Sequence, residues 1–346
     1  MLQFTRLKAR RNDTLALAAV PEKAEPFEPQ TRMYRYEHAD EGMGQWFHDD
    51  YDVDVADICV FDDPNLTDPA LDDAGGYFVY LSSEGDVIHT YYRENFREKI
   101  EGAGTWTSRS KLGRLYAIEQ VGSHLYACGD NGQFYRREGR DDWRPLSREA
   151  VVQVERERDA LRNIPNVADP DFLRWSLNAQ NPLNQATILF SIAGRDDVVA
   201  FGERGAVRVW DGKTVVTAEM PPEHHIVHAT MGTSDEIWLV GRDGFVGRLH
   251  DGVLQTFEVG RGSDLFVRSV LFDEALFIAS SARPGGIHML DPATGRAVRV
   301  PVSRQERSNN SFVGIDRSDR RLWIATTKEL LCRTQHGWTA IDHPDF

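Results

Sequence analysis

Residues 197–212 have the sequence DVVAFGERGAVRVWDG, and residues 236–252 have the sequence EIWLVGRDGFVGRLHDG. In both stretches an apolar run of strand length leads into a G-x-x-G turn, a second strand-like run and an Asp-Gly turn. Glycine permits the positive φ of tight hairpin loops, so each stretch predicts two antiparallel strands joined by a short turn. The chain therefore repeats a β-hairpin unit.

Working outward, each hairpin is preceded by a strand of small residues and followed by a further short strand, which makes four strands per unit. The first strands of the last four units begin at residues 188, 226, 266 and 312, so their spacings are 38, 40 and 46 residues. A four-stranded repeat of about forty residues is typical of β-propeller blades, because such units bury their faces only when stacked around an axis.

Further units extend the repeat toward the N-terminus. One spans residues 115–146, and another begins at Ala56, continues from Tyr77 and ends in a strand near Thr105. Strand-like stretches at 14–20 and 32–38 indicate that residues 1–50 supply one more blade or close the ring. We therefore predict an all-β fold over residues 1–346, a single β-propeller domain of six or seven blades, with seven favoured.

The repeats resemble those of known propellers. Residues 322–341, LWIATTKELLCRTQHGWTAI, resemble the blades of sensor propellers attached to two-component regulators. The two hairpin stretches quoted first resemble WD-type and photosystem-assembly-type propeller repeats. The resemblance runs from about Leu115 to the C-terminus and implies the fold, but not a function, because propellers host many unrelated activities.

Residues 148–185 interrupt the repeat. Apolar residues at near-helical spacing, including Val151, Val154 and Leu161, lie among charged ones and predict a short amphipathic helical insertion. It either projects as a partner-binding lid over the channel or packs on the edge of a blade.

Charge is distributed unevenly along the chain. Residues 36–92 contain fifteen Asp and Glu and no Lys or Arg, whereas the whole chain has a formal charge of −14. A region of one sign attracts an oppositely charged partner and repels nucleic acid, so the run predicts a surface for a basic protein. The alternative is that these carboxylates only keep the protein soluble.

Within this acidic run, Trp46 and Phe47 are aromatic residues flanked by charge, a common arrangement at binding hot spots. Burial of both rings in the core is the alternative. The predicted partner-binding residues are Trp46, Phe47, Asp49, Asp50, Asp52, Asp54, Asp62, Asp63, Asp72 and Asp73.

Candidate metal sites are weaker. His224, His225 and His228 form an HHxxH cluster without a carboxylate at fixed spacing. Asp50, Asp52 and Asp54 alternate as calcium ligands can, but their spacing fits a strand with one acidic and one apolar face better. We expect no metal and no cofactor.

Catalytic motifs are missing from the sequence. It contains no nucleophile elbow or phosphate-binding loop, and nothing selects a carboxylate pair for glycoside hydrolysis. No apolar run approaches the roughly 20 residues that span a bilayer. Cys59, Cys128 and Cys332 lack metal or redox spacing and predict buried thiols in a cytoplasmic protein.

These observations favour a non-enzymatic, protein-binding propeller. Its most concrete form is an acidic inhibitor or immunity protein that neutralises a basic bacterial toxin such as a nuclease, because carboxylates can imitate a phosphate backbone. A general scaffold or ligand-sensing propeller is one alternative. A propeller enzyme, such as a metal-assisted lyase or a glycosidase, is another.

Overall fold

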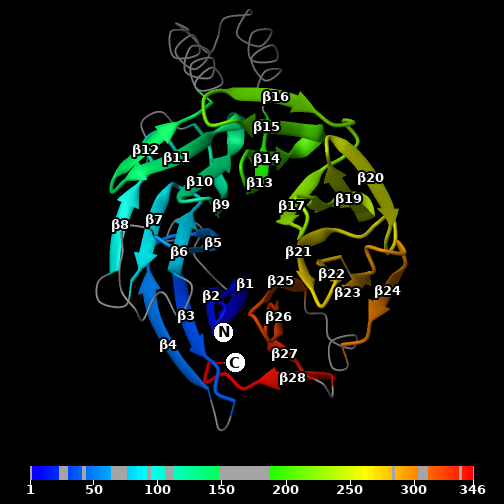
Figure 1. Cartoon of the computed structure of the whole chain (residues 1–346). Helices are drawn as coiled ribbons and strands as arrows, with labels where there is room; N and C mark the ends of the chain where they lie inside the picture. The colour runs from blue at the N-terminus through cyan, green and yellow to red at the C-terminus, as the bar shows by residue number, and fades with distance from the viewer. Residues whose placement is uncertain are drawn as a thin grey trace, which may run out of the picture.

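The computed structural model describes residues 2–22, 30–40, 44–63, 76–91, 95–105, 112–147, 187–282, 285–302, 311–334 and 337–345. Within these residues, 28 strands form seven four-stranded antiparallel sheets, each made of four consecutive strands. The sheets stand around one axis as the blades of a seven-bladed β-propeller (Figure 1). The predicted fold is confirmed, with seven blades.

In every blade the first strand lies nearest the axis and the fourth lies outermost. Blade 1 contains β1 (Leu2–Ala9), β2 (Thr14–Pro21), β3 (Thr31–Glu37) and β4 (Gln45–Tyr51). Blade 2 contains β5 (Val55–Phe61), β6 (Tyr77–Ser82), β7 (Asp86–Thr90) and β8 (Asn95–Lys99). Blade 3 contains β9 (Leu115–Val121), β10 (His124–Gly129), β11 (Phe134–Gly139) and β12 (Asp142–Pro145).

The remaining blades follow the same order. Blade 4 contains β13 (Leu189–Gly194), β14 (Val198–Gly202), β15 (Ala206–Trp210) and β16 (Val215–Glu219). Blade 5 contains β17 (Ile226–Met231), β18 (Ile237–Gly241), β19 (Phe245–His250) and β20 (Val253–Glu258). Blade 6 contains β21 (Phe266–Phe272), β22 (Ala275–Ser280), β23 (Gly286–Leu290) and β24 (Ala297–Val300). Blade 7 contains β25 (Phe312–Arg317), β26 (Leu322–Thr326), β27 (Leu330–Thr334) and β28 (Gly337–Ile341).

Every inner strand carries a one-residue register shift against the second strand of its blade. A bulge of this kind bends the strand and turns the following side chain to a new direction. In β17 the shift precedes His228, whose Nδ1 accepts a hydrogen bond from the backbone N–H of Ser269 in the next blade, at 3.2 Å. In β13 it precedes Ser191, whose Oγ accepts from Ala229 N at 2.9 Å. The bulges thus help to join neighbouring blades.

The G-x-x-G turns form short 3₁₀ helices, η1 (Asp130–Gly132), η2 (Glu203–Gly205) and η3 (Arg242–Gly244). Their two glycines serve different purposes. In blade 4, Gly205 has φ +69°, a left-handed conformation that favours glycine. Gly202 is extended, but an added Cβ would overlap the Ile188 carbonyl oxygen, so glycine is needed there for close backbone approach.

The core is divided among the wedges between blades. Trp143, Trp210, Trp238 and Trp323 are buried and belong to four of the resulting clusters. Cys59, Cys128 and Cys332 are buried free thiols, which confirms that prediction. Burial raises the pKa of the Cys59 and Cys128 thiols, so neither is a reactive thiolate.

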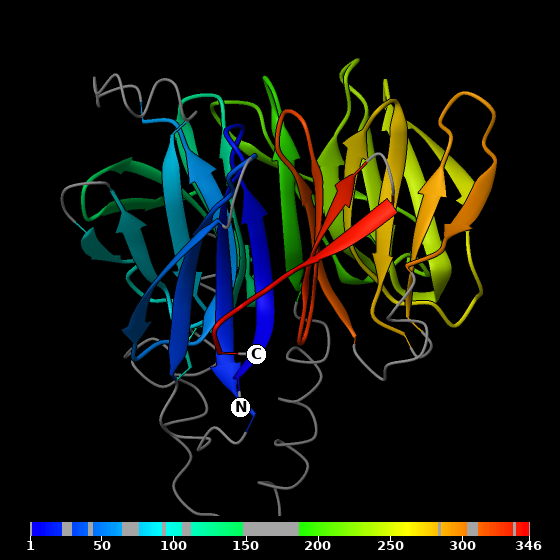
Figure 2. The same ribbon diagram turned by 90° about the horizontal axis from the view of Figure 1, so that it is seen from below.

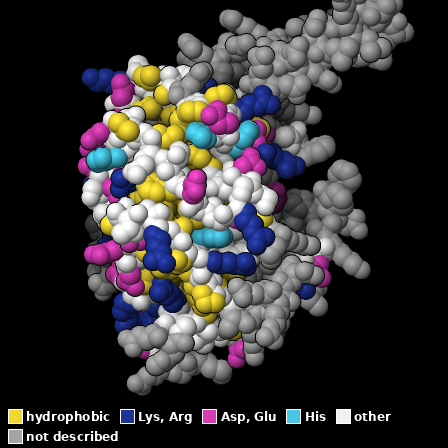
Figure 3. All heavy atoms as spheres, turned by 90° about the vertical axis from the view of Figure 1, so that its right-hand side faces the viewer, with side chains coloured by type: hydrophobic (Ala, Val, Ile, Leu, Met, Phe, Trp, Pro, Cys, Tyr) yellow, Lys and Arg dark blue, Asp and Glu magenta, His cyan; other side chains and the backbone are white. Residues whose placement is uncertain are grey.

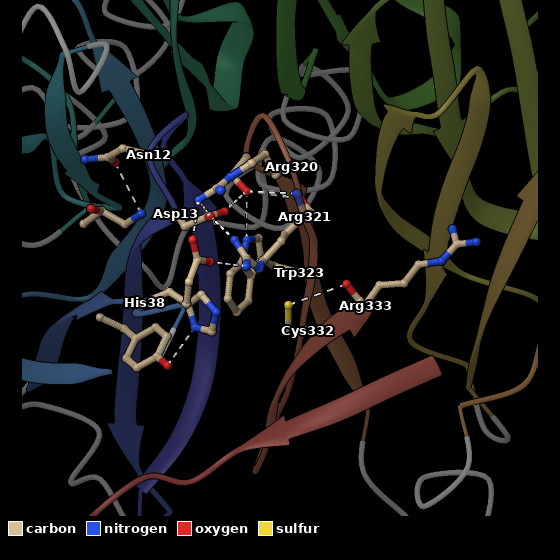
Figure 4. Close-up of polar contacts among 12 residues, drawn as sticks. Asn12, Asp13, His38, Arg320, Arg321, Trp323, Cys332 and Arg333 are labelled. Atoms are coloured by element: carbon tan, nitrogen blue, oxygen red, sulfur yellow. Dashed lines mark hydrogen bonds and ion pairs between the residues drawn. The ribbon is translucent and has the colours of Figure 1, made fainter. Parts of the chain in front are cut away.

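The N-terminal segment forms blade 1 on its own, and β1 packs against β25 to close the ring without a shared sheet. Figure 2 shows the first and last blades side by side, with both termini on one face. At the junction the buried Asp13 carboxylate pairs with Arg320 and Arg321 of blade 7, and the Asp40 carboxylate pairs with the same two arginines (Figure 4). Packing, ion pairs and backbone hydrogen bonds, such as Phe4 N to Thr327 O at 2.9 Å, therefore join the two blades in place of a shared strand.

Two details differ from the sequence analysis. The outer strand of blade 2 is β8, not a strand near Thr105, whose backbone N–H and hydroxyl instead bind Glu84. Asp50, Asp52 and Asp54 do not share one strand, because β4 ends at Tyr51 and residues 52–54 connect it to β5. The predicted helical insertion at 148–185 lies outside the described residues. Among the described residues, no helix has the length and hydrophobicity needed to cross a bilayer.

Candidate partner-binding groove

A groove of about 730 Å³ lies between blades 1 and 2. One wall is formed by β3 and β4, which contribute Arg35, Phe47, Asp49 and Tyr51. The other wall is formed by β6 and β7 of blade 2, with Tyr80 among its residues. We call this feature the blade 1–2 groove.

The groove follows from how the wedge between these blades is filled. Near the axis, small alanines of β2 pack with Ile58, Phe78 and Tyr80 of blade 2 in one buried cluster. Blades diverge with distance from the axis, and the side chains of β4 do not fill the wider part. As a result the Phe47 side chain is 41% exposed.

Charged groups line the apolar floor. The Arg35 guanidinium lies 4.5 Å from the Phe47 ring centroid, and its Nε is 3.2 Å from Glu37 Oε1. Arg10 lies 5.5 Å from the Phe78 ring centroid. Burial and the neighbouring Arg35 lower the pKa of Arg10 to about 10. Both cations therefore stack on aromatic faces, an arrangement that favours defined orientations of these flexible side chains.

Asp49 contributes a carboxylate to the groove. It is exposed and, in the part of the chain that the structure describes, makes no hydrogen bond or ion pair. It acts on its neighbours, because burial and then the Asp49 charge raise the pKa of Tyr51. A free carboxylate beside an exposed aromatic ring suits the ammonium or guanidinium group of a partner.

The structure divides the predicted site residues between two faces of β4. Phe47 and Asp49 line the groove, whereas Trp46 faces the C-terminal segment, where its Nε1 donates to Asp342 O at 3.0 Å. The His343 ring lies 4.1 Å from the Trp46 ring. Asp50 forms a bidentate pair with Arg32, with Nε–Oδ1 at 2.7 Å. Trp46 and Asp50 therefore already have partners within the chain.

The other predicted aspartates are spread along blade 2. Asp52 pairs with Arg97 at 3.2 Å, and the Asp54 carboxylate accepts from Ser83 Oγ at 3.1 Å. Asp62 and Asp63 follow the far end of β5, a seven-residue strand about 23 Å long. They are therefore not brought together with Asp52 and Asp54. Asp72 and Asp73 lie outside the described residues.

The three clustered histidines do not converge. His224 stacks on Phe245 with ring centroids 4.4 Å apart, and His228 lies on β17 with its Nδ1 bound to Ser269. Among the described residues, no group of three or more His, Cys, Asp or Glu is placed to hold a metal ion.

Arginines from outside the acidic run neutralise part of it, which its sequence did not indicate. Arg32, Arg97, Arg268 and Arg321 lie outside residues 36–92, yet they pair with Asp50, Asp52, Asp57 and Asp40 respectively. Sequence reasoning also missed Arg35 and Tyr80 in the groove. The alternating pattern of β3 places Met33, Arg35 and Glu37 on one face, and this pattern could have indicated that Arg35 lies in the groove.

Comparison with solved structures supports the fold. YCF48 bound to a D1 peptide superimposes with a TM-score of 0.59, covering 95% of this chain and 92% of that chain at 11% identity. The WD40 β-propeller domain of Doa1 superimposes with a TM-score of 0.56, covering 98% and 99% at 10% identity. No protein-family model matches the chain, and no curated protein matches its sequence. At these identities the likeness shows the fold alone, and the chain is a β-propeller repeat protein.

Proposed function

We propose that this propeller is a non-enzymatic protein-binding module and that the blade 1–2 groove is its partner-binding surface. The observation that supports this most directly is the exposed Phe47 beside the unpaired Asp49, in a groove of about 730 Å³. The similar YCF48 structure contains a bound peptide, so a propeller of this shape is compatible with a polypeptide ligand.

The partner of this proposal is basic. The chain carries a formal charge of −14, which attracts a cationic protein over a distance of about one Debye length, near 10 Å at 0.1 M salt. The side of the molecule that carries blades 5 and 6 has both signs of charge interspersed, so that side offers no surface of a single sign (Figure 3). Phe47 supplies apolar contact area, and Asp49 supplies the charge that a lysine or arginine would meet.

The most specific form of the proposal is an inhibitor or immunity protein for a basic toxin such as a nuclease. A bound propeller covers a large surface and would block a cationic cleft. A cytoplasmic location belongs to the same proposal, because free buried cysteines are usual in a reducing compartment.

The test is capture of partners from native lysate at low and high salt, with Asp49→Lys and Phe47→Ala as variants. Glu258→Lys is the matched control, because Glu258 is also an exposed carboxylate on an outer strand. We expect a stoichiometric basic partner that high salt releases and that both groove variants lose. Equal capture by Asp49→Lys and the wild-type chain would refute the groove. A nuclease assay on the captured partner, with and without the propeller, decides the inhibitor form.

A further inference from the structure

The inner strands of all seven blades enclose a cavity of about 300 Å³ on the propeller axis. A volume at the lower end of the usual range for ligand sites suits a small molecule. The walls carry the charged residues Lys8, Asp57, Glu119, Arg268 and Asp316. The channel is therefore polar, and both signs of charge face it.

The carboxylates are held in place by the ring itself. Asp57 Oδ2 accepts the backbone N–H of Ile118 at 3.1 Å, and its Oδ1 pairs with Arg268 from the opposite side of the channel. Asp316 Oδ2 accepts Ala9 N at 2.9 Å. These contacts fix the orientation of the Asp57 and Asp316 carboxylates before any ligand binds.

Lys8 forms ion pairs with two of these carboxylates. Its Nζ lies 3.6 Å from Glu119 Oε2 and 3.9 Å from Asp316 Oδ2, so both contacts are long ones. Burial alone would lower the pKa of Lys8, but Glu119 and Asp316 raise it, so the ammonium stays charged. Its three N–H groups are donors that a ligand in the channel can share with the two carboxylates.

His228 adds a donor to the same wall. Its Nδ1 accepts from Ser269 N, so the neutral ring carries its proton on Nε2. Burial, Arg268 and Lys8 all lower the pKa of His228, which keeps the ring neutral. The cavity thus combines donors, namely Lys8 and His228, with the acceptors Glu119 and Asp316.

We propose that the channel binds a small polyhydroxylated molecule, such as a monosaccharide or a cyclitol. A free anion would face three carboxylates, and a free cation would face Lys8 and Arg268. A hydroxyl group both accepts hydrogen bonds and donates one, so the hydroxyls of a single polyol suit a wall that carries the Lys8 ammonium beside the Glu119 and Asp316 carboxylates. This inference is independent of the groove between blades 1 and 2.

The test uses the full chain with three probes: myo-inositol, glucose and alanine. Isothermal calorimetry and ligand-observed saturation-transfer NMR measure binding of each. We expect saturable binding of at least one polyol and none of alanine. Lys8→Met lowers the association constant roughly tenfold or more, the usual effect of losing a hydrogen bond to a charged group. Lys213→Met, at an exposed turn, leaves it unchanged.

A second variant guards against loss of folding in Lys8→Met. Thr230 lines the channel, so Thr230→Leu fills space there while every charge remains, and it should abolish binding, whereas Thr230→Ser should not. Circular dichroism checks that each variant is folded. The proposal is overturned if neither polyol binds the wild-type chain, if alanine binds in place of a polyol, or if binding survives in Thr230→Leu.

Discussion

At the scale of single residues, Glu98 shows how this propeller buries a charge. It is 1% exposed and accepts from Arg137 Nη2 at 2.6 Å and from Trp143 Nε1 at 2.9 Å, while His89 Nε2 lies 3.5 Å away at the limit of hydrogen bonding. Burial alone would raise the pKa of Glu98. The contacts with His89 and Arg137 outweigh burial and hold the pKa at about 2.

Glu98→Gln should therefore destabilise the fold by about 3 kcal/mol at pH 7, since it leaves the Arg137 charge buried without its partner. The folded pKa lies below the ordinary value of 4.5, so the stabilisation is complete above about pH 4.5 and is lost as pH falls toward 2. Urea unfolding followed by tryptophan fluorescence, at pH 7 and at pH 3, measures the difference in unfolding free energy between the wild-type chain and Glu98→Gln. This difference should be smaller at pH 3.

The control is Glu258→Gln, which changes an exposed carboxylate of β20. We expect a change in unfolding free energy within about 0.5 kcal/mol. A Glu98→Gln variant as stable as this control at pH 7 would show that the buried contacts contribute nothing net.

At the scale of strands and turns, local pattern predicted most of the molecule. Hairpins around 197–212 and 236–252 followed from glycine chemistry and apolar runs, because those depend on neighbours in sequence. The ends of strands were harder to predict. β4 ends at Tyr51, yet Asp52 and Asp54 continue its alternating pattern in sequence while they connect it to β5. The candidate site was predicted only in part, since Arg32 and Arg97 are brought to Asp50 and Asp52 by pairing between strands.

The hydrogen bonds between inner strands lead to a second stability prediction. Ser191→Ala removes the acceptor of Ala229 N and leaves a buried N–H without a partner, because Ser191 is 4% exposed. We expect a loss of about 1–2 kcal/mol in unfolding free energy. Ser123→Ala, at an exposed turn where the hydroxyl contacts the neighbouring His124 ring, should be close to neutral. Chemical denaturation of both variants makes the comparison, and equal stability would mean that water replaces the lost acceptor.

At the scale of the whole molecule, ring closure is the feature that the sequence left open. The four strands of each blade come from one continuous segment, so blades 1 and 7 share no sheet, although backbone hydrogen bonds such as Phe4 N to Thr327 O, at 2.9 Å, join them. Phe4, Leu17, Trp323 and Leu330 form a shared buried cluster, and Asp13 bridges to Arg320 and Arg321. Because no sheet is shared between the two blades, the contacts of this junction determine how stably the ring is closed.

Asp13→Asn should therefore open the junction before it unfolds the ring. Asp13 has φ +59°, a conformation that asparagine tolerates, so the turn geometry is kept while the charge that pairs with Arg321 is removed. Native-state hydrogen exchange should become faster in β1, β2, β25 and β26 and stay unchanged in β13–β16 on the far side of the ring. The matched control is Asp141→Asn, another positive-φ aspartate at an exposed turn. Uniform acceleration across all seven blades would mean instead that the ring opens as one cooperative unit.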